Sequence, residues 1–184
     1  MNLKKLFIAQ KELDEHIEKN HPRKEGEDRF GKLILALQVE LAECAQESRC
    51  FKFWSSRQEP VTEDLRVVDY KESGEAILET YNPLLEEYVD CLHFILSIGL
   101  ELNIPVIYGT ETKWDELTSD ETDITQQFLL VFENVNKLVH PIDWINLFEE
   151  FYILGKMLGF TWEQIEESYF EKNRINHERQ NNGY

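Results

Sequence analysis

Hydrophobic and polar residues recur at helical spacing along most of the chain. Apolar positions three and four residues apart predict amphipathic helices. The segments with this pattern are residues 3–19, 30–47, 84–102, 123–138 and 143–158. Thr161-Trp-Glu-Gln164 has the pattern of a capping box and predicts the start of a last helix. The aromatic faces of the segments at 123–138 and 143–158 are interpreted as core and subunit interface. The chain is therefore predicted to be all-α, with residues 1–184 in a single domain.

The helical periodicity weakens between residues 55 and 83, where charged residues dominate. Within this stretch, Leu65-Arg-Val-Val68 predicts a short strand or one turn of helix. A long excursion of this kind is usually functional or mobile, and two interpretations stand: a lid over an active site and a solvated insertion. Polar connections are also predicted at residues 20–27 and 103–119, which contain helix-breaking Pro and Gly.

Two of the apolar helical segments each carry two carboxylates three positions apart. Glu40 and Glu43 form the first pair, and Glu87 and Asp90 form the second. Side chains at this spacing share a helix face, with Cβ atoms about 5–6 Å apart. A solvated face is the ordinary explanation for one such pair. Both pairs, however, lie among Leu, Ala and Val, where uncompensated charge is costly. If the two helices pack side by side, four carboxylates converge, and such hard oxygen ligands favour Mg²⁺.

The composition narrows the classes of partner. Nineteen basic and 36 acidic residues give a net charge of −17, so we expect no general attraction to nucleic acid or to an anionic membrane. A polyanionic nucleotide would need bound cations and a local basic cluster. The chain has no apolar run long enough to span a membrane and no signal-peptide pattern, and we expect a cytoplasmic location. Cys44, Cys50 and Cys91 lack CxxC spacing and are interpreted as reduced, buried side chains.

The last predicted helix carries a stripe of hydrogen-bond donors. Tyr169, Lys172, Asn176 and Arg179 recur at spacings of three, four and three residues. They contribute a hydroxyl, an ammonium, an amide and a guanidinium group. An ordinary solvated face would mix in acidic residues, so this stripe favours phosphate binding.

Polar and aromatic residues elsewhere allow two interpretations each. Gln10 and Asp14 lie four apart, on or beside the buried face of the first helix, where they could form a local hydrogen bond or contact the edge of a nucleobase. His93 shares the face of the second acidic pair and is either a hydrogen-bonded core residue or a substrate contact. Phe53 and Trp54, beyond the second helix, are either core residues or a cover for a base.

The motifs together resemble a known superfamily. Glu40-x-x-Glu43 followed by Glu87-x-x-Asp90 resembles the ExxE…ExxD signature of the all-α nucleoside triphosphate pyrophosphohydrolases, which include the MazG proteins and the dimeric dUTPases. The opening Leu6-Phe7-x-x-Gln10-x-x-Leu13-Asp14 and the C-terminal residues 169–184 are similar to the dimeric dUTPase branch. The resemblance covers most of the chain.

The resemblance implies a MazG-like helical bundle that dimerises through its helices and takes dUTP as its substrate. It implies two or more Mg²⁺ ions, with Mn²⁺ as an alternative metal, on Glu40, Glu43, Glu87 and Asp90. Water would attack the α-phosphorus to give dUMP and pyrophosphate, with Glu40 and Glu43 as catalytic residues and Glu40 as the base. The implied substrate-binding residues are Gln10, Asp14, Phe53, Trp54, His93, Tyr169, Lys172, Asn173, Asn176 and Arg179.

Three alternatives compete with this function. A broader-specificity pyrophosphohydrolase of the MazG type would share the carboxylates without requiring this first helix and this C-terminal stripe. A di-iron bundle would need two inward Glu-x-x-His motifs, and Glu18-x-x-His21 stands at a helix end next to Pro22. A non-catalytic helical interaction protein would show no metal dependence.

Overall fold

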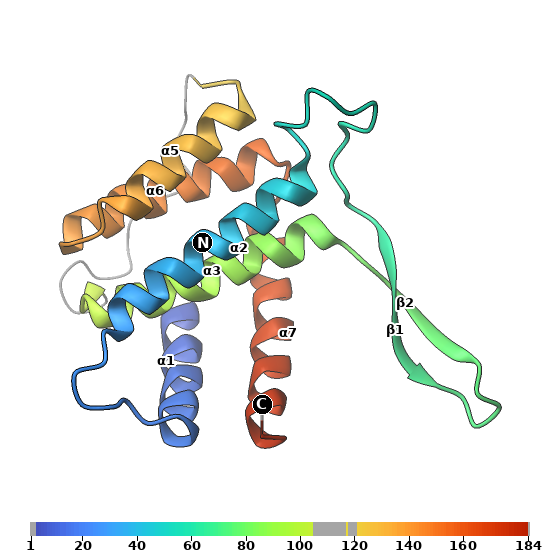
Figure 1. The fold of residues 1–184 in the computed structure, drawn as a ribbon, viewed down its shortest axis with the longest axis horizontal. Coiled ribbons are helices and arrows are strands. Elements are labelled where there is room, and N and C mark those ends of the chain that lie inside the picture. Colours follow the sequence, from blue (N-terminus) through green and yellow to red (C-terminus); the bar gives the residue numbers. More distant parts are fainter. Residues whose placement is uncertain (1–2, 105–116, 118–120, 184) are drawn as a thin grey trace.

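The computed structural model describes residues 3–104, 117 and 121–183, and this part of the chain is mostly helical (Figure 1). Its helices are α1 (Leu3–Asn20), α2 (Arg29–Ser48), α3 (Pro83–Glu101), α5 (Ile124–Asn136), α6 (Pro141–Met157) and α7 (Trp162–Asn181). The two strands are β1 (Asp64–Tyr70) and β2 (Ala76–Tyr81). The all-α class predicted from the sequence is confirmed. The connection predicted at 103–119 lies almost entirely outside the described residues.

The local sequence explains where the helices begin. Asn82 caps α3 by accepting a hydrogen bond from the Leu85 amide, and a proline in the first turn supplies a preset backbone angle. Thr161 and Gln164 form the predicted capping box of α7. α6 begins two residues earlier than the sequence predicts, because the carboxylate of Asp143 accepts a hydrogen bond from the His140 amide and caps the helix there.

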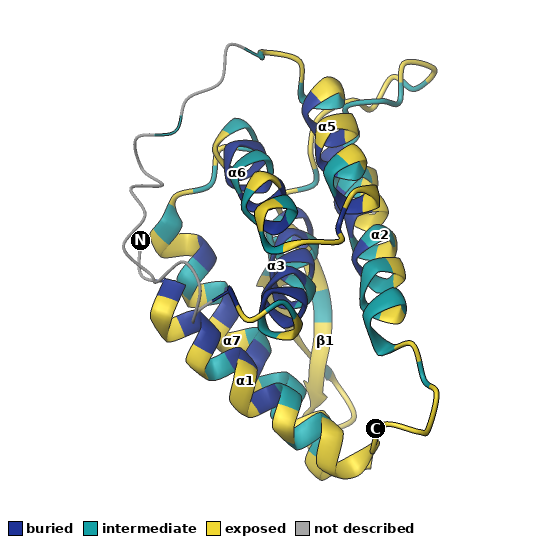
Figure 2. Ribbon diagram, turned by 90° about the vertical axis from the view of Figure 1, so that its left-hand side faces the viewer, coloured by how far each residue is buried: buried dark blue, intermediate teal, exposed yellow. Residues whose placement is uncertain are grey.

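α3 is the central helix of the fold. It packs against α1, α2, α6 and α7, and its residues are buried along most of its length (Figure 2). α2 runs antiparallel beside it, with α5 and α6 packed on one side of this pair (Figure 1). α1 and α7 lie side by side below α3 and cross it at a steep angle. Four helices, α1, α2, α3 and α7, therefore approach one another around the middle of α3.

Aromatic side chains of α6 fill the core, as the sequence predicts. Trp144 is fully buried and its indole N–H donates to the Ile95 carbonyl oxygen of α3 at 2.7 Å. Gly99 permits this close contact, since a Cβ atom there would lie 2.9 Å from the indole nitrogen. The Tyr88 ring stacks on Phe151 with a centroid distance of 4.2 Å, and its hydroxyl donates to the Phe151 carbonyl oxygen. These contacts fix α6 against the apolar side of α3.

The charged excursion contains an antiparallel hairpin of β1 and β2 that projects from the helical body (Figure 1). The pairing runs from Asp64 opposite Tyr81 to Tyr70 opposite Ala76. Every residue of β1 except Arg66 is exposed, and Figure 2 shows the strand as an exposed ribbon. The short strand expected near residues 65–68 is confirmed, whereas its partner strand was not predicted.

None of the helices described in residues 3–104 and 121–183 combines the length and the apolar character needed to cross a lipid bilayer.

Candidate active site

Three of the four predicted metal ligands converge where α2 meets α3. Glu40 of α2 and Glu87 and Asp90 of α3 each offer a carboxylate oxygen, and these atoms lie within 4.8 Å of one another. All three side chains are half-buried. Three oxygen donors so close together form the kind of site that binds a hard divalent cation.

The surroundings make this carboxylate cluster electrostatically unfavourable without a cation. Burial, followed by the charges of Asp90 and Glu43, raises the pKa of Glu40 to about 7. Burial and the charges of Asp90, Glu43 and Glu40 raise the pKa of Glu87 to about 7. Burial also raises the pKa of Asp90, although Lys172 opposes the shift. The donor set therefore fits a bound metal, because a cation would remove the cost of ionising all three groups.

Lys172 of α7 supplies a positive charge beside the cluster. Its ammonium donates to Asp90 Oδ2 at 2.6 Å and to Glu86 Oε1 at 3.0 Å. The Lys172 side chain is 11% exposed. Burial alone would lower its pKa, but the two carboxylates outweigh burial and raise it. Lys172 is thus held in its charged form at the edge of the metal site.

Glu43 lies outside this group of three. It is exposed on α2, yet its charge contributes to the raised pKa values of Glu40 and Glu87. Glu43 is therefore close enough to interact with the cluster, and its role as a fourth ligand stays a prediction.

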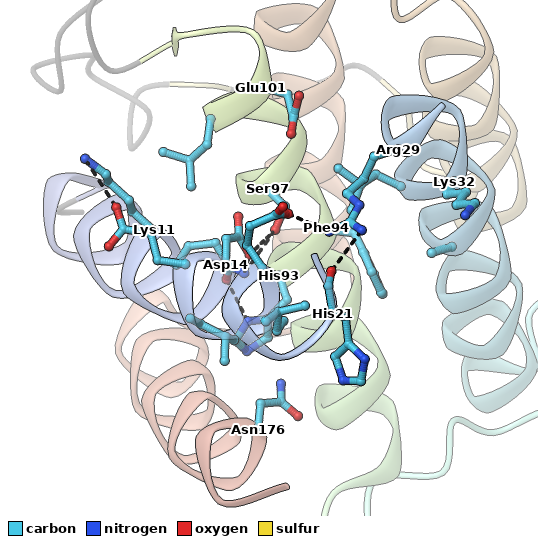
Figure 3. A pocket seen from close by; sticks show the side chains of 18 of the residues that line it. Lys11, Asp14, His21, Arg29, Lys32, His93, Phe94, Ser97, Glu101 and Asn176 are labelled. Carbon is cyan, nitrogen blue, oxygen red and sulfur yellow. Dashed lines mark hydrogen bonds and ion pairs between the residues drawn. The ribbon is translucent and has the colours of Figure 1, made fainter. Parts of the chain in front are cut away.

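A cleft of about 1190 Å³ runs from the cluster along α1, α2, α3 and α7. Figure 3 shows Asp14, His93 and Ser97 gathered on one side of it, with Asn176 of α7 nearby. The predicted site residues that line the cleft are Gln10, Asp14, Glu40, Asp90, His93, Lys172, Asn176 and Arg179. The fold thus brings the first helix, one residue of each acidic pair and three residues of the C-terminal stripe to one cleft.

Gln10 is the centre of a buried hydrogen-bond network beside the cleft. Its side-chain amide donates to Asp14 Oδ1 at 2.8 Å and to Ser97 Oγ at 3.0 Å. Its carbonyl oxygen accepts from the Tyr169 hydroxyl at 2.8 Å and lies 2.8 Å from His93 Nδ1. Both ends of the amide are therefore occupied, and this fixes its orientation.

The network also fixes the state of His93. Because Gln10 presents its carbonyl oxygen, His93 Nδ1 carries the proton and donates it. Burial, assisted by the charge of Lys172, lowers the pKa of His93 to about 3, so the imidazole is neutral. Its Nε2 atom is then an acceptor, and it is buried with no hydrogen-bond partner among the described residues. The ring stacks on Tyr169 at a centroid distance of 4.3 Å.

Asp14 links Gln10 and Ser97 in the network, because its Oδ1 atom accepts a hydrogen bond from each. Ser97 Oγ donates to Asp14 Oδ1 at 2.9 Å. Burial raises the pKa of Asp14 to about 6, although the hydrogen bonds from Gln10 and Ser97 oppose the shift. The local hydrogen bond between Gln10 and Asp14 that the sequence allows is present. Both side chains also line the cleft, and their contact with a nucleobase stays a prediction.

Comparison with known proteins agrees with this arrangement. A family model described as dUTPase matches residues 2–69 and 76–184. The chain belongs to this dUTPase family. No curated protein and no solved structure matches the chain. The resemblance to the all-α dUTPases is confirmed, and membership supports hydrolysis of dUTP by a nucleotide pyrophosphatase as the general activity.

The dUTPase family match leaves out residues 70–75, which are the last residue of β1 and the turn that joins β1 to β2. It includes the helices that carry the carboxylate cluster, the first helix and the C-terminal stripe.

Several residues implied by the dUTPase resemblance lie away from the cleft lining. Tyr169 is fully buried and acts on Gln10 through its hydroxyl. Asn173 is buried and its side chain donates to the Ala9 carbonyl oxygen at 3.4 Å. Phe53 and Trp54 are 86% and 66% exposed, and their rings contact each other edge-on at 5.0 Å. Their contact with a nucleotide remains a prediction.

The structure adds residues to this dUTPase site that the sequence analysis did not select. Ser97 lies one turn beyond His93 on α3, so the helical spacing could have indicated it. Arg29 and Lys32 line the far part of the cleft (Figure 3). They are ion-paired with Glu18 and Glu27, respectively, at 2.8 Å. Lys32 stands two turns before Glu40, a spacing that also places both on one helix face.

Proposed function

We propose that this protein hydrolyses dUTP to dUMP and pyrophosphate with Mg²⁺ bound at Glu40, Glu87 and Asp90. One observation supports this most strongly: three carboxylate oxygens lie within 4.8 Å of one another, and two of the three residues, Glu40 and Asp90, line a cleft that Lys172, Asn176 and Arg179 also line. Acidic ligands and cationic donors are both needed to hold a metal-bound triphosphate.

Glu43 would complete the proposed ligand set, and the four carboxylates would hold two or more Mg²⁺ ions. Mn²⁺ replaces Mg²⁺ because it prefers similar oxygen ligands. The bound metal supplies charge neutralisation and lowers the pKa of a coordinated water. Protein side chains carry out proton transfer, phosphate binding and placement of the base.

Glu40 accepts the proton of the attacking water in this proposal. It lines the cleft, and a carboxylate there can act as a general base. Lys172 and Arg179 bind the terminal phosphates and stabilise the charge on the departing pyrophosphate. Asn176, with Asn173 behind it, donates to the phosphate chain or the sugar.

The Gln10 network positions the base in the proposed complex. Gln10, Asp14 and His93 line one side of the cleft. His93 presents an unpaired acceptor, and a neutral imidazole does not repel a polar N–H group of the base. Phe53 and Trp54 cover the base after the nucleotide binds, because rings that are this exposed can bury a large apolar surface against a base.

We also propose a cytoplasmic homodimer in which residues 1–184 act as one domain. Cys44, Cys50 and Cys91 are free, which suits a reducing compartment.

Leu35 and Val39 are exposed one turn apart on α2, an uncharged surface on a chain of net charge −17. Sedimentation equilibrium tests the dimer, and Leu35→Asp should shift it towards the monomer.

Pyrophosphate release tests the activity directly. The substrates are dUTP, dCTP, dTTP and UTP, each with Mg²⁺ and with a chelator. Selective, Mg²⁺-dependent release from dUTP supports the proposal. Similar release from several nucleotides would assign the protein to the broader MazG type, and no release from any would exclude the catalytic function.

A further inference from the structure

A series of ion pairs leads from the hairpin to the carboxylate cluster. Lys172 of α7 contacts Asp90 at 2.6 Å and Glu86 at 3.0 Å through the same ammonium group. The second carboxylate oxygen of Glu86, Oε2, accepts a hydrogen bond from Arg66 Nη1 of β1 at 2.9 Å. Arg66, Glu86 and Lys172 lie on three different elements, so folding alone brings them together.

Arg66 is held in place on the hairpin. It is the one residue of β1 that is not exposed. Its guanidinium lies 4.8 Å from the centroid of the Tyr81 ring and 3.6 Å from the Glu79 carboxylate. A planar guanidinium with an aromatic ring and two carboxylates around it has little rotational freedom. Arg66 can therefore orient Glu86, whose side chain is 27% exposed.

The position of Glu86 matters because Lys172 and a metal ion compete for Asp90. A divalent cation on Asp90 would repel the ammonium group. Glu86 is not part of the three-carboxylate group that can share one ion, so it remains available to Lys172. With Glu86 in place, Lys172 would keep a carboxylate partner at the cleft when Asp90 binds a metal ion.

We propose that Glu86 is a positioning residue for Lys172, and that Arg66 of the hairpin is a positioning residue for Glu86. The inference rests on the proposed function, in which Asp90 binds metal and Lys172 binds phosphate. Without Glu86, Lys172 pairs with Asp90 alone, competes more strongly with the metal and is less well placed for the nucleotide. The projecting hairpin is in this way coupled to the active site.

Mn²⁺ binding to the nucleotide-free protein and steady-state kinetics with dUTP test the proposal. We expect Glu86→Gln to raise the Kd for Mn²⁺ and the KM for dUTP roughly three- to tenfold, with kcat changed less than about twofold. We expect Arg66→Met to raise both about threefold. The matched control is Glu75→Gln, which breaks an ion pair with Lys71 on the same hairpin and should change neither.

Two comparisons separate positioning from a general effect of charge. Removal of the positive charge of Arg66 would tighten Mn²⁺ binding if charge alone mattered, whereas loss of positioning weakens it. In a Lys172→Met background, Glu86→Gln should cause no further change, because Glu86 acts through Lys172. Thermal melts of each variant establish that it is folded.

Each outcome decides the proposal. An unchanged Kd and KM in Glu86→Gln, or an equal effect with and without Lys172, would overturn the role of Glu86. Tighter Mn²⁺ binding in Arg66→Met would overturn the role of Arg66. If the wild-type protein neither binds Mn²⁺ nor hydrolyses dUTP, the proposed function fails and this inference fails with it. If the wild-type protein does both, a negative result concerns the positioning residues alone.

Discussion

Two parts of the cleft are built in opposite ways: the Gln10 network, which we call its base end because we propose that it positions the base, and the carboxylate cluster, which we call its carboxylate end. At one end, Gln10 makes four hydrogen-bond contacts of 2.8 to 3.0 Å, and the groups around it are buried and largely satisfied. At the other end, Glu40, Glu87 and Asp90 place like charges within 4.8 Å, and burial raises all three pKa values. The protein itself supplies the hydrogen-bond partners at the first end, whereas the donor set at the second end fits a bound cation.

The Gln10 network should therefore contribute mainly to stability, and the carboxylate cluster mainly to metal binding and activity. A satisfied network of buried polar groups stabilises and orders the folded state. A cluster of partly buried carboxylates lowers the stability of the metal-free protein and raises its affinity for a divalent ion. Substitutions at the two ends should therefore affect activity and folding in different proportions.

The largest effect on activity is expected from Glu87→Gln. Loss of one metal ligand should lower kcat/KM for dUTP by about 10²- to 10³-fold, because the metal stabilises the charge that develops in the transition state. The metal-free variant should be as stable as the wild type or more stable by about 1 kcal/mol at pH 8, since one like charge is removed. Pyrophosphate release and thermal melts measure the two quantities. A fall in both activity and stability would contradict the proposed cost of the cluster.

Gln10→Met should have the opposite effect: a large loss of stability with metal binding unchanged. The variant keeps the length of the side chain but leaves Asp14, Ser97, His93 and Tyr169 without their shared partner. We expect a loss of about 2–4 kcal/mol in the free energy of unfolding and a higher KM for dUTP, with unchanged Mn²⁺ affinity. Urea denaturation and Mn²⁺ titration measure these effects.

Gln127 provides a matched control for this substitution. It is also a fully buried glutamine, and its amide donates to the carbonyl oxygen and the carboxylate of Glu150 at 2.9 and 2.7 Å. Gln127→Met should lower stability in the same way and leave the KM for dUTP unchanged. A raised KM in this control would mean that instability, not the site, explains the Gln10 result.

Local sequence patterns predicted the elements that carry both ends of the cleft. The apolar periodicity gave α2 and α3, and the spacing of three placed Glu87 and Asp90 on one face. The spacing of four placed Gln10 beside Asp14, and their side chains are hydrogen-bonded at 2.8 Å. Thr161 and Gln164 gave the start of α7. Helical spacing and capping are local, so a single sequence contains enough information for them.

Contacts between distant residues could not be predicted in this way. The second strand of the hairpin has consecutive apolar residues followed by Glu79 and Thr80, and it has no buried face to set an alternating pattern. Arg66, Glu86 and Lys172 meet only after three elements pack, and no local pattern marks that contact. The exposure of Trp54 likewise depends on the path of the chain after α2, which the aromatic residues alone do not determine.

The pH dependence of stability should also distinguish the two ends of the cleft, with a smaller effect than the substitutions above. The pKa values of Glu40 and Glu87 are raised to about 7, and that of Asp14 to about 6. A raised pKa in the folded state means that the unfolded chain releases its protons first. The contribution of these three groups to stability is therefore fully present below about pH 4 and is lost as the pH rises through 6 and 7.

We expect the metal-free protein to lose about 1–2 kcal/mol in its free energy of unfolding between pH 5 and 8. Added Mg²⁺ should restore the part due to Glu40 and Glu87 at pH 8 and have little effect at pH 5, where these groups are protonated. Thermal melts at both pH values, with and without Mg²⁺, measure this. Asp14→Asn should leave the Mg²⁺ effect intact, and stabilisation by Mg²⁺ that is equal at both pH values would contradict the assignment.

The smallest effect on stability is expected from Trp54→Ala, which tests whether the base end is complete without a cover. Trp54 is 66% exposed and lies outside the cleft lining, so its loss should change the free energy of unfolding by less than about 0.5 kcal/mol. If Trp54 covers the base in the complex, the KM for dUTP should still rise about fivefold, because a stacked ring is lost from the bound state alone. Tyr70→Ala is the control, since Tyr70 is 64% exposed on the hairpin and should leave KM unchanged. An unchanged KM in Trp54→Ala would mean that Trp54 does not cover the base, and that the Gln10 network and the carboxylate cluster bind the nucleotide without this ring.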